Sequence, residues 1–125
     1  MVQEIKLEEY VAEMADEVRQ KIVILSKKDR NYSIDPLTII YIVSIIIEIV
    51  KWFVINYGKN KNTTELAESF GKMNWFQKWI LWSFCRRESE SKIEAKYIYR
   101  SLLEKINEMS LEERIKLFTL KESVL

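Results

Sequence analysis

The chain has 125 residues, of which 48% are hydrophobic, and its 20 Lys and Arg nearly balance its 19 Asp and Glu. This length suits one domain with a core of its own, so we predict a single helical domain over residues 1–125. Two glycines and one proline are too few for sheets joined by tight turns, which indicates an all-α fold. The formal net charge of +1 excludes a strongly basic protein that coats nucleic acid.

The chain contains one cysteine, Cys85, and no histidine. These counts exclude an internal disulfide and a multi-cysteine zinc site, and they remove the most common metal ligand and general base. We therefore predict a protein that is not an enzyme, with no catalytic residue, metal or cofactor, and we expect Cys85 to be a small buried side chain. The charged start MVQEIKLEEY lacks the apolar core of a secretory signal, which predicts an intracellular location or a particle assembled inside a cell.

The first predicted helix covers about residues 3–28. Apolar residues recur in it at three- and four-residue steps, with acids crowded into its first half and Lys27 and Lys28 at its end, as suits the helix dipole. Asp35 and Pro36 then indicate an N-cap and a first helical residue, which begin a second helix. Gly58 is the natural C-cap of that second helix.

Shorter helices are predicted in the second half of the chain. Asn62 or Thr64 can cap ELAESF, and Asn74 can cap WFQKWILWSFCRR. Periodic apolar residues then define a fifth helix: Ile93, Ala95, Ile98, Leu102, Leu103, Ile106 and Met109. Ser110 and Glu113 have capping-box spacing for a last helix. The sequence therefore predicts one compact domain of five or six helices around a central, broadly apolar helix over residues 37–57.

This central segment, LTIIYIVSIIIEIVKWFVINY, is long enough to cross a bilayer at about 1.5 Å per residue. Its polar residues fall on one narrow face: Tyr41, Ser44, Glu48 and Lys51. Glu48 and Lys51 are spaced to form an ion pair, so we interpret Glu48 as a paired residue near the surface rather than a proton carrier. Because basic residues flank both ends and the run before Glu48 is short, we favour a core helix of a soluble protein, with a membrane span as the alternative.

The segment NWFQKWILWSFCRR is unusually rich in aromatic residues. On a helix it forms two neighbouring lines, one of Trp75, Trp79, Trp82 and Arg86 and one of Phe76, Ile80, Phe84 and Arg87. We expect one line to face the core and the other to need a cover. Since tryptophan and arginine dominate binding hot spots, the predicted partner-binding residues are Trp75, Trp79, Trp82, Arg86 and Arg87. A stripe that is simply core, base stacking on nucleic acid, and seating among lipid headgroups stay open as alternatives.

Basic residues concentrate in the segment 59–100, which has nine Lys and Arg against five Asp and Glu. This balance of +4 indicates a second candidate function, contact with nucleic acid phosphates. The residues that would make this contact are Lys59, Lys61, Lys72, Lys78, Arg86, Arg87, Lys92, Lys96 and Arg100.

The order of SIDPLTIIYIVSIIIEIVKWF, a short acidic helix and GKMNWFQKWILWSFCRRE resembles small helical proteins of tailed phages, particularly the crAss-like group. The likeness covers roughly residues 33–90 and carries no functional residue across. It implies a structural component of a virion. Our leading hypothesis is a small non-enzymatic helical protein that joins a larger assembly, such as a phage virion, through contacts with other proteins or with copies of itself. Contact with nucleic acid through 59–100 and a membrane span over 37–57 are the alternatives.

Overall fold

The computed structural model describes residues 6–29 and 33–120. Over these ranges the chain forms six α-helices, one 3-10 turn and no strand. The elements are α1 (Leu7–Ser26), α2 (Thr38–Tyr57), η1 (Gly58–Asn60), α3 (Thr63–Gly71), α4 (Trp75–Glu88), α5 (Lys92–Glu108) and α6 (Leu111–Thr119). The predicted all-α class is therefore confirmed, with 83% of the structure helical. The expected start of the first helix near residue 3 lies outside the described residues.

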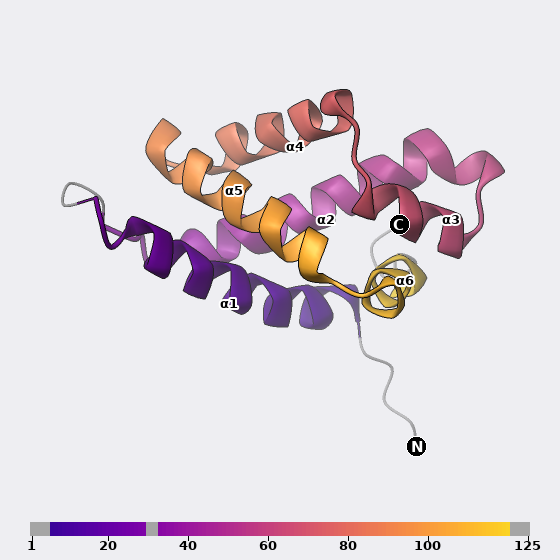
Figure 1. Cartoon of the computed structure of the whole chain (residues 1–125), viewed down its shortest axis with the longest axis horizontal. Coiled ribbons are helices and arrows are strands. Elements are labelled where there is room, and N and C mark those ends of the chain that lie inside the picture. Colours follow the sequence, from indigo (N-terminus) through magenta and orange to yellow (C-terminus); the bar gives the residue numbers. More distant parts are fainter. Residues whose placement is uncertain (1–5, 30–32, 121–125) are drawn as a thin grey trace, which may run out of the picture.

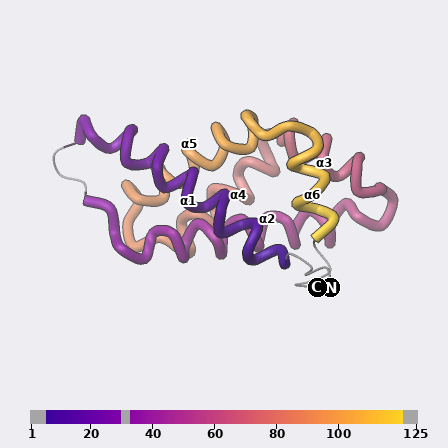
Figure 2. Tube along the Cα trace, turned by 90° about the horizontal axis from the view of Figure 1, so that it is seen from below, coloured from indigo at the N-terminus to yellow at the C-terminus, as the bar shows by residue number. Residues whose placement is uncertain are grey.

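Four long helices form a ring around the core. Helix α1 packs on α2, α2 on α4, α4 on α5, and α5 back on α1. In Figure 1, α1 lies along the lower edge and α4 along the upper edge, with α5 in front and α2 behind. The short helices α3 and α6 pack on each other at one end of the ring, as Figure 2 also shows. Each long helix, α2 included, therefore keeps one side turned outward.

Each of the helices α3 to α6 begins with a side-chain cap. Three of these caps are at predicted residues, and the fourth, on α5, was not predicted. Asn62 accepts a hydrogen bond from the Glu65 backbone N–H at 2.8 Å. Asn74 and Ser110 each complete a reciprocal capping box, and Ser91 caps α5. One expectation was wrong by two residues, because α2 begins at Thr38 and not after Asp35. The Asp35 carboxylate instead accepts from the Leu37 backbone N–H at 2.8 Å, so Asp35 forms a turn ahead of the helix.

The core joins the ring to the α3–α6 pair through three phenylalanines. Phe53 of α2 meets Phe70 of α3 edge to face, with ring centroids 5.4 Å apart, and Phe70 meets Phe118 of α6 at 5.3 Å. All three rings are buried. Full burial of such a side chain stabilises a fold by about 1.5–3 kcal/mol, so this cluster holds the two parts together.

A buried polar contact joins the first turns of α2 and α5. The Thr38 hydroxyl donates to Glu94 Oε2 at 2.9 Å, and the other oxygen of Glu94 accepts from the Glu90 backbone N–H at 3.0 Å. Nearby, the Tyr41 hydroxyl donates to Glu90 at 2.8 Å. That hydrogen bond raises the pKa of Tyr41 to about 12. The two helix starts are therefore held in register by polar groups that satisfy one another.

Helix α2 contributes seven buried residues and still has apolar residues outside. The buried set is Thr38, Ile42, Ile45, Ile46, Ile49, Val50 and Phe53. On the outward side, Ile40 is 56% exposed and Ile55 is 70% exposed. The segment Thr38–Asn60, with a mean hydropathy of 2.2, is long and apolar enough to cross a membrane, and 39% of its most apolar window is buried. Since the core helix of a soluble protein meets the same criteria, the preference for a soluble protein stays a prediction.

Glu48 lies at the surface as predicted, but with a different partner. Its carboxylate is 3.7 Å from the guanidinium of Arg87 on α4, so the expected pair with Lys51 was wrong. The packing of α4 beside α2 places the longer Arg87 side chain within reach. Both side chains are well exposed, at 39% and 55%, so the pair adds about 1 kcal/mol at most.

Gly71 ends α3 where that helix meets α6. A Cβ at this position would overlap Nη1 of Arg114. The same nitrogen donates to the Ala67 carbonyl at 3.3 Å, so the guanidinium fills the space that the glycine leaves open. An alanine at residue 71 would therefore require the end of the Arg114 side chain to move.

Gly71→Ala should lower the melting temperature, because it displaces the Arg114 guanidinium and costs about 1–3 kcal/mol for the lost hydrogen bond. With Arg114→Ala as background, Gly71→Ala should be neutral or stabilising, because alanine is favoured over glycine in a helix by about 1 kcal/mol. Thermal unfolding of the four proteins measures both effects. An equal loss in both backgrounds would contradict this role for Gly71.

Candidate interaction surface

Helix α4 buries only a narrow line of residues, Gln77, Leu81 and Cys85. Neither predicted line is the buried one, so the expectation that one whole line would face the core was wrong, although Ile80, Trp82 and Phe84 are partly buried against the core. The reason lies at the helix start, where Gln77 closes the capping box by accepting from the Asn74 backbone N–H at 2.9 Å. This places a polar residue inside. At 100° per residue, Leu81 and Cys85 follow it, and the tryptophans turn outward.

The five predicted partner-binding residues lie in different surroundings. Trp75 and Trp79 are 79% and 56% exposed, so the alternative that the stripe is simply core is wrong for these two. Trp82 is half-buried against Tyr99 of α5, with ring centroids 5.5 Å apart. Arg86 is exposed. Arg87 lies on the other side of α4, next to Glu48 and Glu88, with its guanidinium 5.0 Å from the Phe84 ring centre.

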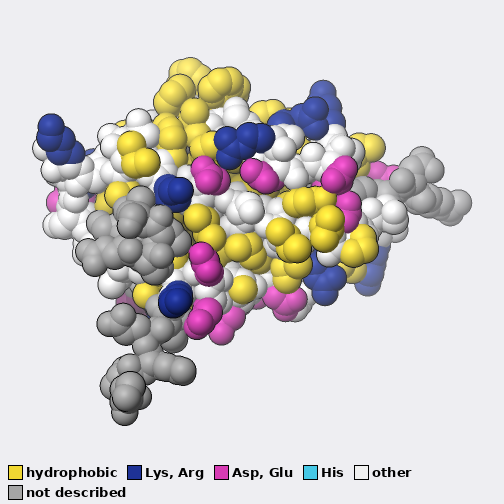
Figure 3. Space-filling model, turned by 180° about the vertical axis from the view of Figure 1, so that it is seen from behind, with side chains coloured by type: hydrophobic (Ala, Val, Ile, Leu, Met, Phe, Trp, Pro, Cys, Tyr) yellow, Lys and Arg dark blue, Asp and Glu magenta, His cyan; other side chains and the backbone are white. Residues whose placement is uncertain are grey.

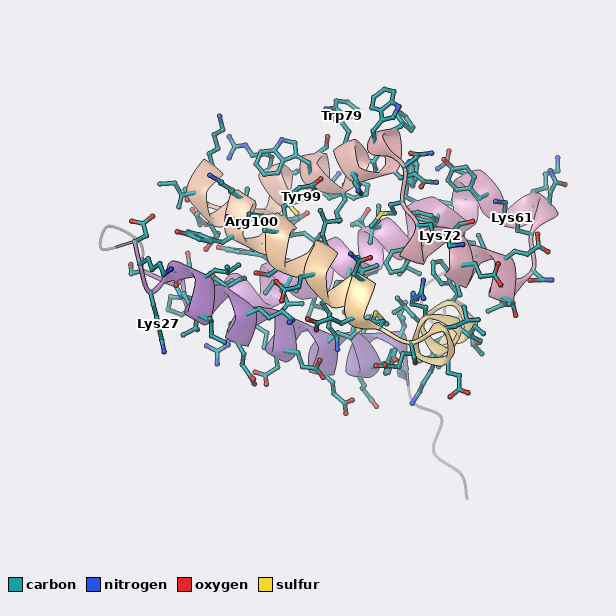
Figure 4. The ribbon with its side chains drawn as sticks, viewed as in Figure 1. Lys27, Lys61, Lys72, Trp79, Tyr99 and Arg100 are labelled. Atoms are coloured by element: carbon teal, nitrogen blue, oxygen red, sulfur yellow. The ribbon has the colours of Figure 1, made fainter. Side chains whose placement is uncertain are left out.

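Four aromatic side chains and one lysine line an open hollow between α4 and α5. The lining residues are Trp75, Lys78, Trp79, Trp82 and Tyr99, and the volume is about 370 Å³. We call these five residues the aromatic surface; Figure 4 labels Trp79 and Tyr99 within it. Tyr99 was absent from the sequence prediction, because only the packing of α5 on α4 brings it beside Trp82. The hollow is shallow and wide, which suits contact with a large partner more than enclosure of a small molecule.

A chain of ring contacts fixes the exposed tryptophans to the core. Trp79 stacks on Phe76 with centroids 6.3 Å apart, and Phe76 lies 6.1 Å from Trp52 of α2. Trp52 in turn meets the buried Phe53 at 5.5 Å. Side chains held in this way lose little conformational freedom on binding, so the surface is prepared for a partner.

Around the aromatic surface the acidic side chains have partners, whereas several basic side chains form no ion pair. The four acids of α4 and α5, and Glu90 between the two helices, all contact other groups: Glu88 contacts Arg87, Glu90 contacts Tyr41, Glu94 contacts Thr38, and Glu104 and Glu108 contact Lys21. Within residues 6–29 and 33–120, Lys78, Arg86 and Lys96 form no ion pair. The surroundings of the aromatic surface therefore carry positive charge that the molecule itself does not neutralise.

The nine basic residues of segment 59–100 are all exposed. They do not gather in one place, because Lys61 and Lys72 lie toward one end of the molecule and Arg100 toward the other (Figure 4). Lys61 also donates to Ser69 at 3.3 Å and lies over the Tyr57 ring. The structure therefore places the predicted phosphate contacts in separate groups, of which Lys78 is in the aromatic surface.

Cys85 is buried, as the sequence predicts. Burial raises the pKa of its thiol above the ordinary value, which keeps it protonated. In the part of the chain that the structure describes, no three acidic or cysteine side chains come together to hold a metal ion. Comparisons with protein-family models, with curated proteins and with solved structures each found no match to this chain.

Trp79→Ala should leave the fold intact and lower its stability by about 1 kcal/mol or less, since over half of the side chain is already in water. Leu81→Ala, two residues along the same helix, should cost about 2–5 kcal/mol because Leu81 is fully buried. Chemical denaturation of both variants measures the difference. Similar losses would show that Trp79 supports the core.

Cys85 should resist alkylation by iodoacetamide at mildly alkaline pH in the native protein and react fully in denaturant. Folding raises the pKa of the Cys85 thiol, so above the unfolded thiol pKa of about 8.5 the unfolded chain loses this proton while the folded chain keeps it. The free energy of unfolding should therefore be unaffected by this group below that pH and should decrease as pH rises beyond it. Mass spectrometry measures the fraction of chains that are alkylated, and the Cys85→Ala variant is the control without a thiol. Rapid labelling of the native chain would contradict the buried position.

Proposed function

We propose that this protein is a non-enzymatic component of a larger protein assembly and joins it through the aromatic surface on α4. The observation that carries the proposal is the exposure of Trp75 and Trp79, at 79% and 56%, on a helix that is itself firmly packed. Each tryptophan presents about 150–250 Å² of surface that a partner could bury. Residues of this kind, anchored and central, supply most of the binding energy at protein interfaces.

Two separate apolar areas support a role between neighbours. Figure 3 shows hydrophobic side chains protruding at the upper edge, over α4, and a second group across the centre, over α2. The exposed residues of these areas include Trp75 and Trp79 on α4 and Ile40 and Ile55 on α2. A protein that occupies a fixed place in an assembly needs more than one contact, and two such areas on different sides meet that need.

The kind of assembly follows from the resemblance of residues 33–90 to small helical proteins of tailed phages. On this basis we propose a virion as the assembly and its structural proteins, or further copies of this chain, as the partners. The protein would then be made in the cytoplasm of the host and carried in the particle.

A second candidate function is contact with nucleic acid, favoured by the exposed Lys78 inside a hollow lined by aromatic rings. Rings of this kind stack on bases while cations meet phosphates. Such binding would weaken as salt rises, because phosphate contacts release counterions. A membrane role would rest on α2 and its exposed Ile40 and Ile55.

Replacing both Trp75 and Trp79 with alanine should release the protein from its assembly while leaving it folded. Loss of one central tryptophan costs about 2 kcal/mol or more at a hot spot, which corresponds to at least a roughly 30-fold loss of affinity. The measurement is the amount of each variant that remains in particles or complexes isolated from the native source. Leu111→Ala on α6 is the matched control, since Leu111 is 37% exposed and away from α4. Full retention of the double variant would exclude the aromatic surface as the contact.

A further inference from the structure

We propose that the aromatic surface of one copy binds the outward face of α1 on a second copy, so that copies of this chain join head to tail. This inference rests on the proposed function and identifies the chain itself as the partner.

The outward face of α1 carries acidic side chains, which the aromatic surface lacks, together with exposed apolar ones. Its first half carries the acids Glu9, Glu13 and Asp16, and its second half exposes Val23 and Ile24, at 37% and 67%. Within the described part of the chain, none of these three acids forms an ion pair. The face is therefore negative at one end and apolar near the other, where the exposed Lys27 follows.

Along α4 the apolar residues come first and the charged residue follows, which is the reverse of the order along α1. Its first half carries Trp75 and Trp79, and Arg86 follows without an ion pair among the described residues. Positive and apolar groups thus lie along one line of α4, as negative and apolar groups do along α1.

The spacings on the two helices also agree. Arg86 follows Trp79 by seven residues and Trp75 by eleven. On α1, Val23 follows Asp16 by seven residues and Ile24 follows Glu13 by eleven. Both spacings correspond to about 10 and 16 Å along a helix. If α4 lies antiparallel on α1 of the next copy, one register places Trp79 opposite Val23 and Arg86 opposite Asp16. A register shifted by three residues, about 4.5 Å, places Trp75 opposite Ile24 and Arg86 opposite Glu13. In either register a tryptophan meets the apolar end and Arg86 meets an acid.

One molecule cannot make this contact within itself. Helices α1 and α4 lie along opposite edges of the molecule (Figure 1), and α1 packs on α2, α5 and α6 instead. A contact between two different faces leaves one face of each kind free at the ends of an open oligomer. Such a contact continues as a filament or closes as a ring.

The distribution of charge supports a second copy over other partners. Residues 1–58 carry seven Lys and Arg against nine Asp and Glu, whereas 59–100 carry nine against five, so a nearly neutral chain has separated its charges. Self-association covers both the acidic face and the basic face, whereas nucleic acid or an anionic membrane would cover only the basic one. The contact should weaken as salt rises, because the charges lie at the surface.

Two variants that each block one face test the proposal. Trp79→Ala with Arg86→Glu blocks the aromatic surface, and Glu13→Lys with Ile24→Ser blocks the α1 face. Sedimentation velocity over a wide range of concentration, at low and high salt, should show wild-type mass growing with concentration at low salt and each variant staying monomeric. An equimolar mixture of the two variants should form a dimer and nothing larger, since only one intact face of each kind remains. Leu111→Ser with Glu112→Lys on α6 is the matched control and should assemble like the wild type.

A wild type that stays monomeric at every concentration would overturn the inference, as would an α1 variant that assembles normally. Monomeric wild type that binds a single-stranded oligonucleotide or vesicles of anionic lipid, with loss of binding in the Trp79 variant, would assign the surface to that ligand instead. A different result would contradict the proposed function, namely that the tryptophan variants are retained in the native assembly.

Discussion

Each helix in a ring of four can bury only one side, and this limit decides where the surplus apolar residues of the chain lie. Helix α2 is apolar around most of its circumference, so burial of Ile42, Ile49 and Phe53 leaves Ile40 and Ile55 outside. Helix α4 turns a single narrow line inward and exposes its largest side chains. The outer surface is therefore apolar in two places because the interior has no more room, and a partner that covers them gains the burial that the ring cannot supply.

Polar contacts decide which side of each helix faces inward. The capping box of Asn74 and Gln77 orients the first turn of α4, and Glu94 holds the first turn of α5 to Thr38 of α2. Arg87 of α4 pairs with Glu48 and Glu88, and Lys105 of α5 pairs with Glu17, whereas Lys78, Arg86 and Lys96 form no ion pair among the described residues. On α1, Glu17 pairs with Lys105, and Glu9, Glu13 and Asp16 form no ion pair among the described residues. The separation of charge thus follows from how the helices are held.

The sequence was sufficient to predict the elements but not the way they turn toward one another. Caps at Asn62, Asn74 and Ser110 depend on residues three positions apart, so local reasoning found them. The orientation of α4 was missed, because the buried polar Gln77 interrupts the apolar pattern. Tyr99 and the pairing of Glu48 with Arg87 depend on contacts between helices distant in sequence, which periodicity within one helix does not reveal.

Closure of the ring by α1 and α5 has a consequence for the order of folding during synthesis. Helices α1 and α2 leave the ribosome first and can pair as neighbours, but their shared apolar side stays open until α4 and α5 have emerged. The contact of α3 with α6 forms later still, since α6 is the last of the described helices to be made. Contacts between distant segments slow folding and prolong the exposure of apolar surface. The nascent chain would therefore be most prone to aggregation, and most in need of a chaperone, between the synthesis of α2 and that of α5.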